Sequence, residues 1–338
     1  MSIFRKTLSC AVLAALGTCA LVGCGRQDTS NEATTSASPE ASAAITETIS
    51  ESTASSEQTS SSEASGAQPA ETEPAVSEAP SVDDSTPYGQ HGALHVENGK
   101  LTDADGNIVQ LYGMSTHGIA WFPQYINYDS FRTLRDDWNT NCIRLAMYTA
   151  EYGGYCAGGD KEQLKQLVRD GVSYATELGM YVIVDWHILS DCDPNQNKDE
   201  AIAFFREMSE TFADNDNVLY EICNEPNSGT SWDSIKSYAE EVIPVIREQK
   251  PDAVILVGTP TWSQEIDKAA ASPLTFDNVM YTLHFYAGTH KDDLRNRLET
   301  CAQNNLPVFV SEFGMCDASG NGANDFDSTT KWLDLLNK

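Results

Sequence analysis

The stretch Val218-Leu-Tyr-Glu-Ile-Cys-Asn-Glu-Pro226 is a short apolar run that ends in a carboxylate, Glu225. A second run of the same kind, Pro307-Val-Phe-Val-Ser311, leads directly into Glu312. Short runs rich in β-branched residues are typical of buried strands in a parallel sheet. In a barrel of parallel strands, the carboxyl ends of different strands meet on one face. We therefore expect Glu225 and Glu312 to lie close together on that face.

Similar apolar runs recur along the chain and alternate with amphipathic helical stretches. With the two above, the predicted strands are 108–114, 142–148, 181–187, 218–225, 254–259, 279–286 and 307–314. The clearest helix is 164–178, where apolar residues recur at steps of three and four and Gly179 follows as a C-cap. Alternation of this kind favours a parallel sheet with both faces covered. The predicted fold is a (β/α)₈ TIM barrel, preceded by a hairpin over residues 93–108.

A doubly wound open sheet is the alternative, but it would carry a glycine-rich phosphate-binding loop after its first strand. The segment Met114-Ser-Thr-His-Gly-Ile119 is not such a loop. The strand count is one short of a complete barrel, because only a loop and a helix over about 327–336 follow Gly314. We therefore expect the sequence to be a fragment that lacks the last βα unit.

The first 87 residues differ in character from the rest. Residues 1–23 have a basic start and an interrupted apolar stretch, which is the layout of a secretory signal rather than of a membrane span. Leu21-Val-Gly-Cys24 resembles a bacterial lipobox, so Cys24 is the predicted lipid attachment site; an ordinary cleaved signal is the alternative. Residues 24–87, rich in Ser, Thr, Ala, Glu and Pro, predict a disordered linker. A domain over 88–338, lipid-anchored outside the bacterial cell, is the expected organisation.

The composition restricts the partners. The formal net charge of −29 makes nucleic acid an unfavourable partner, whereas a neutral polysaccharide is compatible with it. The cysteines of the domain show no C-x-x-C pair and no zinc-like spacing, so we expect mostly free thiols and no metal. They are Cys142, Cys156, Cys192, Cys223, Cys301 and Cys316. The chain is expected to be a monomer.

A pair of strand-end glutamates suits the cleavage of a glycosidic bond. One carboxylic acid protonates the leaving oxygen and the other carboxylate lies opposite it. Arg144 is in the middle of a predicted buried strand, where an unpaired charge is very unfavourable. We expect its guanidinium to orient the nucleophilic carboxylate through a bidentate pair.

Several motifs are similar to those of glycoside hydrolase family 5 endoglucanases, in the family's order and across the whole domain. They are Ile143-Arg-Leu-Ala-Met-Tyr148, Asp185-Trp-His-Ile-Leu189, Tyr220-Glu-Ile-Cys-Asn-Glu-Pro226, Tyr281-Thr-Leu-His-Phe-Tyr-Ala287 and Val310-Ser-Glu-Phe-Gly314. The resemblance implies a (β/α)₈ barrel and retaining hydrolysis of β-1,4-glucan without a cofactor. It further implies Glu225 as acid/base and Glu312 as nucleophile. The sugar-stacking tryptophan that the family carries at the eighth strand has no counterpart here.

Other residues near the strand ends are expected to support the site. Asn224 precedes Glu225 and is expected to donate to a sugar 2-hydroxyl. His284 and Tyr286 lie two apart on one strand and so face the same side, with Tyr286 expected to contact Glu312. His187 closes the third predicted strand and His117 follows the first, so both are expected to line the same face. Trp121 and Tyr148 are expected to stack on sugar rings there.

Two alternative functions are compatible with the sequence. The first is hydrolysis of another β-glycan, namely mannan, xyloglucan or mixed-linkage glucan. The second is a non-catalytic surface protein that binds polysaccharide with the same barrel. The presence of Arg144, Asn224, Glu225 and Glu312 together favours an enzyme.

Overall fold

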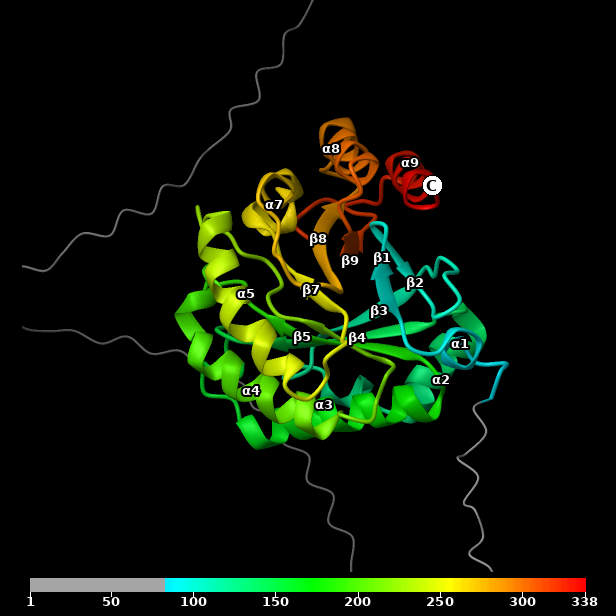
Figure 1. The fold of residues 1–338 in the computed structure, drawn as a ribbon, viewed down its shortest axis with the longest axis vertical. Helices are drawn as coiled ribbons and strands as arrows, with labels where there is room; N and C mark the ends of the chain where they lie inside the picture. Colours follow the sequence, from blue (N-terminus) through cyan, green and yellow to red (C-terminus); the bar gives the residue numbers. More distant parts are fainter. Residues whose placement is uncertain (1–82) are drawn as a thin grey trace, which may run out of the picture. The chain divides into compact units, whose positions relative to one another are not determined.

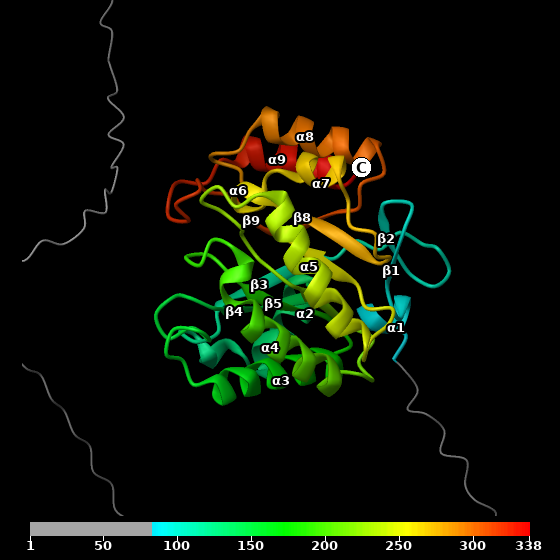
Figure 2. The ribbon, with the colours of Figure 1, turned by 60° about the vertical axis from the view of Figure 1, so that its left-hand side comes forward.

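The computed structural model describes residues 83–338 (Figures 1 and 2). The predicted signal at 1–23, the lipid attachment site Cys24 and most of the predicted linker at 24–87 lie outside these residues, so they stay predictions. Within 83–338, every helix falls short of the length and apolar character needed to cross a bilayer.

Seven parallel strands form one sheet and are hydrogen-bonded in the order in which they occur in the chain. They are β3 (Gly113–Gly118), β4 (Cys142–Tyr148), β5 (Tyr181–His187), β6 (Val218–Glu221), β7 (Ile255–Val257), β8 (Val279–Tyr286) and β9 (Val308–Gly314). A doubly wound sheet reverses its strand order partway, whereas this order never reverses. The barrel prediction is therefore confirmed, with β3 and β9 as the two strands that do not pair with each other.

Apart from α1, which precedes the first strand, the helices follow strands in the chain, and they lie outside the sheet, as Figures 1 and 2 show. They are α1 (Pro87–His91), α2 (Tyr128–Trp138), α3 (Lys161–Glu177), α4 (Lys198–Thr211), α5 (Trp232–Arg247), α6 (Pro260–Ser263), α7 (Ile266–Ala271), α8 (Asp292–Gln303), α9 (Phe326–Leu336) and the short 3₁₀ turns η1 (Pro123–Tyr125) and η2 (Pro194–Asn197). The predicted helix at 164–178 is α3. It begins where the Asp160 carboxylate accepts from two backbone N–H groups, and it ends before Gly179 at φ +64°.

Strands β4 to β8 bury side chains on both faces, as expected for a parallel barrel, whereas β3 and β9 are more exposed. One cluster fills the space between sheet and helices, and a second fills the barrel interior. The interior cluster includes Cys142, Ile183, Leu219, Leu256 and Met280. The hairpin of β1 (His95–Glu97) and β2 (Lys100–Thr102) adds Leu101 to this cluster from the amino-terminal ends of the strands.

The first predicted strand, 108–114, was wrong in its position. Strand pairing begins only at Gly113, and Ile108 forms an isolated bridge with Thr102. Val109 and Leu111 gave the segment its alternating apolar pattern because they pack on the interior cluster, not because they belong to the sheet. All six cysteines of the described residues are free thiols, as expected.

Candidate active site

Glu225 and Glu312 lie at the carboxyl ends of the barrel strands, as predicted, but neither closes a strand. β6 ends at Glu221, so Glu225 belongs to the segment that follows it, and Glu312 lies within β9. One carboxylate oxygen of each lies within 4.8 Å of the other and of a ring nitrogen of His284. Carboxyl groups of retaining glycosidases are about 5–5.5 Å apart, against roughly 6.5–9.5 Å in inverting ones. The spacing therefore fits a retaining site.

Glu312 points into the barrel because of an irregularity in β9. The register between β8 and β9 shifts between Thr282 and His284, so that Val310 and Ser311 together face one residue of β8. Such a bulge breaks the usual alternation of side chains. As a result Ser311 and Glu312 both contact groups inside the barrel.

Arg144 is the centre of a buried network under the two glutamates. Its side chain is 3% exposed and pairs with Glu221 at 2.8 Å, Asp185 at 3.0 Å and Glu312 at 3.3 Å. The expected bidentate pair with Glu312 was wrong, because a single N–H of the guanidinium reaches Glu312. Its Nε donates to Glu221, and its Nη2 donates to Asn224 Oδ1 while lying 3.0 Å from the Asp185 carboxylate.

His284 contacts the other glutamate. Its Nδ1 lies 2.9 Å from Glu225 Oε1 and its Nε2 lies 2.8 Å from Ser311 Oγ, which donates to Glu221 Oε1 at 2.7 Å. Burial alone would lower the pKa of His284, but the neighbouring carboxylates of Glu221 and Glu225 raise it to about 10. A protonated ring donates from both nitrogens, which matches these partners.

Glu312 is held ionised. Burial opposes its charge, but the positive charges of His284 and Arg144 and the hydroxyl of Tyr286 at 2.6 Å bring its pKa to about 2. The predicted contact between Tyr286 and Glu312 is thus confirmed. The same opposition between burial and the charge of Arg144 sets the pKa of Glu221 at about 2.

Asn224 and His187 form one rigid unit with Arg144. The Asn224 Oδ1 accepts from Arg144 at 2.7 Å, and its Nδ2 donates to His187 Nε2 and to the Ile188 carbonyl, both at 3.1 Å. His187 Nε2 is therefore an acceptor, and its Nδ1–H donates to Asp185 at 2.6 Å. Asn224 is buried, so donating to a sugar hydroxyl would require it to exchange one of these bonds.

Aromatic rings line the face beside Glu312. The ring of Tyr148 lies 4.6 Å from that of Trp121, 4.0 Å from that of His187 and 6.0 Å from that of His117, measured between centroids. His117 lies within β3, at φ +56°, rather than after the first strand as predicted. These four residues come together as the sequence predicted.

Sequence reasoning missed the buried layer below the site and one exposed ring. Asp185 and Glu221 are both fully buried and hold Arg144, while Ser311 links Glu221 to His284. A charged residue inside an apolar strand was the available signal for the two carboxylates, as it was for Arg144. Trp262, 44% exposed, follows β7 and donates its backbone N–H to the Pro226 carbonyl.

Among residues 83–338, Glu225, His284 and Glu312 form a group whose spacing would suit a metal ion. Both ring nitrogens of His284 are already hydrogen-bonded, so a metal would have to displace Glu225 or Ser311. The prediction of a site without metal stays a prediction.

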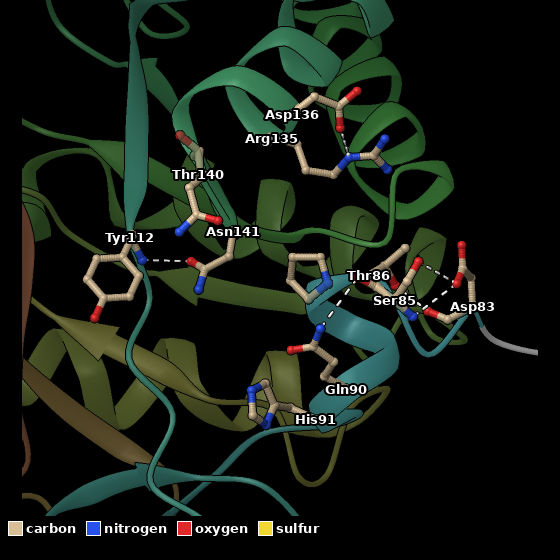
Figure 3. Close-up of a pocket in the computed structure, with 12 residues that line it drawn as sticks. Asp83, Ser85, Thr86, Gln90, His91, Tyr112, Arg135, Asp136, Thr140 and Asn141 are labelled. Carbon is tan, nitrogen blue, oxygen red and sulfur yellow. Dashed lines mark hydrogen bonds and ion pairs between the residues drawn. The ribbon is translucent and has the colours of Figure 1, made fainter.

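A separate hollow of about 430 Å³ lies at the other end of the barrel (Figure 3). Its lining includes Tyr112 and Asn141, which precede β3 and β4, together with Arg135 of α2. Because it opens at the amino-terminal ends of the strands, it takes no part in the site around Glu225 and Glu312.

Comparison with known proteins agrees with this geometry. Residues 102–338 match the cellulase family, glycosyl hydrolase family 5. Endoglucanase A of Butyrivibrio fibrisolvens is 51% identical over 250 residues, covering 73% of this chain and 58% of that protein. An endoglucanase of Clostridium saccharobutylicum is 48% identical over 255 residues, covering 75% and 55%. The chain thus spans somewhat more than half the length of these relatives.

Solved structures give the same result. The structure of cellulase Cel5C_n aligns with a TM-score of 0.74 at 45% identity, covering 75% of this chain and 80% of that one. The catalytic domain of Thermobifida fusca endoglucanase Cel5A, in complex with cellotetraose, aligns with a TM-score of 0.71 at 45% identity, covering 75% and 83%. The barrel fold of this chain, its paired glutamates Glu225 and Glu312, and these similarities together place the chain in the cellulase family, glycosyl hydrolase family 5.

Proposed function

We propose that this protein hydrolyses internal β-1,4-glucosidic bonds of cellulose or related β-glucans and retains the anomeric configuration. The observation that carries the proposal is the approach of Glu225 and Glu312 to within 4.8 Å at the carboxyl face of the barrel. That spacing suits direct attack by one carboxylate while the other protonates the leaving oxygen. The relatives named as endoglucanases support the same reaction.

In the first step Glu312 attacks the anomeric carbon and Glu225 transfers a proton to the departing glycosidic oxygen. The carbon–oxygen bond to the leaving sugar breaks as an ester bond to Glu312 forms. The depressed pKa of Glu312 keeps it ionised for this attack. The Nδ1–H of His284 donates to Glu225 Oε1 and orients the carboxyl group.

In the second step Glu225 removes a proton from a water molecule, which attacks the same anomeric carbon from the face that the leaving group vacated. The ester bond breaks and Glu312 returns to its ionised form. Arg144 and Tyr286 hold the two oxygens of Glu312 throughout, so that its orientation survives the loss and return of charge.

A glucan chain is proposed to lie across this face. The rings of Trp121, Tyr148 and His117 offer flat surfaces beside Glu312, and Trp262 offers another beside the Glu225 segment. The Thermobifida fusca relative was solved in complex with cellotetraose, a glucan oligosaccharide. Mannan, xyloglucan and mixed-linkage glucan are the competing substrates, since the contacts that distinguish them lie in subsites along this face.

Release of reducing ends from carboxymethyl cellulose tests the proposal, with parallel assays on the competing glycans. The wild-type chain is expected to act on the cellulose derivative, while Glu225→Gln and Glu312→Gln still bind glucan without turnover. Binding by the wild type without any hydrolysis would favour the non-catalytic alternative.

We also propose that the protein is a monomeric, exported lipoprotein anchored through Cys24. Support comes from the lipobox-like Leu21-Val-Gly-Cys24 and the polar tract behind it. Cys24→Ser is expected to move the protein from the membrane fraction of its host to the medium or soluble fraction. Unchanged membrane association would contradict the anchor.

A further inference from the structure

The short segment α6, between β7 and α7, is not a right-handed helix but contains three consecutive residues in the left-handed backbone region. Thr261 and Trp262 have φ/ψ of 59/58° and 54/50°, and Ser263 has a φ of 54°. Residues other than glycine visit this region singly, because the side chain crowds the following carbonyl. Such strain persists where surrounding contacts enforce it, and it is concentrated at functional sites.

The contacts that enforce this turn converge on Ser263. Its side chain is fully buried, and its hydroxyl accepts from the Thr259 N–H at 3.2 Å and from the Thr282 hydroxyl at 3.0 Å. The Ser263 hydroxyl donates to the Asn224 carbonyl at 2.7 Å. A hydroxyl has one hydrogen to donate and two lone pairs, so all of its bonding capacity is used.

The Asn224 carbonyl belongs to the peptide group that joins Asn224 to Glu225. The N–H of that same peptide group donates to the Ile188 carbonyl at 3.3 Å, beyond the end of β5. Ser263 therefore holds one side of the peptide plane and the Ile188 carbonyl holds the other. Next along the chain, the Pro226 carbonyl accepts from the Trp262 N–H at 3.0 Å.

The hydrogen bonds from Ser263 and Trp262 are needed because the regular sheet has already ended. The ladder between β6 and β7 stops at Glu221 and Leu256, leaving the segment that carries Glu225 outside it. Gly258 lets the two segments approach, since a Cβ there would lie 2.3 Å from the Cys223 carbonyl oxygen. The left-handed turn continues the contact where strand pairing has ceased.

We infer that Ser263 is a positioning residue, which fixes the position and orientation of the Glu225 carboxyl group through the Asn224–Glu225 peptide. The inference rests on the proposed role of Glu225 as the acid. Because Trp262 lies on the same turn as Ser263, that turn fixes the position of the exposed Trp262 ring relative to Glu225.

Two substrates separate this role from a structural one. Cleavage of a β-glucan requires protonation of the leaving oxygen. A dinitrophenyl β-cellobioside instead releases dinitrophenolate, a stable anion that departs without being protonated. Ser263→Ala and Ser263→Gly should each lower kcat/KM on the glucan by about 10- to 100-fold, as a small misplacement of a catalytic group does. The loss on the dinitrophenyl substrate should be much smaller, because its first step does not need the acid.

The glycine variant relieves the left-handed strain, so it should fold even if the alanine variant does not. Ser209→Ala is the matched control: it removes another fully buried hydroxyl, which donates to the Arg206 carbonyl in α4 away from the site. The control should leave both kcat/KM values unchanged.

Equal losses on the two substrates, or glucan hydrolysis by both Ser263 variants at the control's level, would overturn the inference. Failure of both Ser263 variants to fold, with a folded control, would overturn it too, because the hydroxyl would then serve the fold alone. A wild-type protein inactive on both substrates would instead refute the proposed function.

Discussion

Ser311 and Glu312 are neighbours in the chain, yet the side chains of both make contacts inside the barrel. Ser311 Oγ donates to Glu221 at 2.7 Å, while Glu312 accepts from Tyr286 at 2.6 Å. In a regular strand these two side chains would lie on opposite faces. The bulge in β9 thus joins the nucleophile's strand to the buried layer that supports His284 and the acid.

Removing the Ser311 hydroxyl should break the hydrogen-bonded link between His284 and Glu221. In Ser311→Ala the Nε2 of His284 and one oxygen of Glu221 lose a buried partner, at a cost of about 1–3 kcal/mol in unfolding free energy. Urea unfolding would measure this loss, and kcat on β-glucan should fall with it. Ser311→Thr keeps the hydroxyl and serves as the control. Equal unfolding free energies and equal kcat values in the two variants would contradict a role for the hydroxyl.

Arg144 should be the most sensitive buried position under the site. Arg144→Met leaves Asp185 and Glu221 as buried carboxylates without their cation, which should destabilise the fold by about 3–5 kcal/mol. Differential scanning calorimetry would register this as a lower Tm. Arg206→Met breaks an exposed pair with Glu248 and should change stability by less than about 1 kcal/mol. Similar Tm values for the two variants would contradict the buried network around Arg144.

The pKa values predict opposite pH dependences for two variants. His284 is protonated more strongly in the folded state, with a pKa of about 10 against 6.5. Its stabilising contribution is complete below pH 6.5 and is lost as pH rises towards 10, so the Tm gap between wild type and His284→Gln should close over that interval. A gap that is constant from pH 6.5 to 10 would mean that His284 is not cationic.

The pH dependence of stability due to Glu312 has the opposite sign, because the pKa of Glu312 is about 2 in the folded state against an ordinary value of 4.5. Its contribution is complete above pH 4.5 and is lost as pH falls towards 2. The Tm difference between wild type and Glu312→Gln should therefore change between pH 4.5 and 2 and stay level above that interval. A difference that changes only near neutral pH would be inconsistent with an ionised Glu312.

External azide should distinguish the two glutamates chemically. In Glu312→Gly, azide can occupy the space of the missing nucleophile and attack the anomeric carbon from that side, giving a glycosyl azide of inverted configuration. In Glu225→Gly the covalent intermediate still forms from an activated substrate, and azide attacks it to give the retained product. Nuclear magnetic resonance of the products would identify each anomer, and exchanged outcomes would reverse the assignments of Glu225 and Glu312.

The apolar runs around Ile143, Val182 and Val279 were sufficient to identify their strands, because burial on both faces demands continuous hydrophobic residues. Strand order followed, since βα units pack beside their predecessors. The carboxyl ends of such strands share one face, so the meeting of Glu225 and Glu312 was also predictable. The first strand was misplaced because Val109 and Leu111 are apolar for packing on the interior cluster and not for sheet pairing.

The sequence by itself determined the alternation of parallel strands and helices, the order in which the strands pair and the meeting of Glu225 and Glu312 at the carboxyl face. Only the tertiary structure decided how those residues divide their bonds: Arg144 among three carboxylates, His284 to Glu225 rather than Glu312, and Ser263 to the Asn224 carbonyl. The physical reason is that hydrophobic periodicity is a local property of the chain, whereas bulges, left-handed turns and hydrogen-bond partners depend on atoms that come together only when distant segments pack.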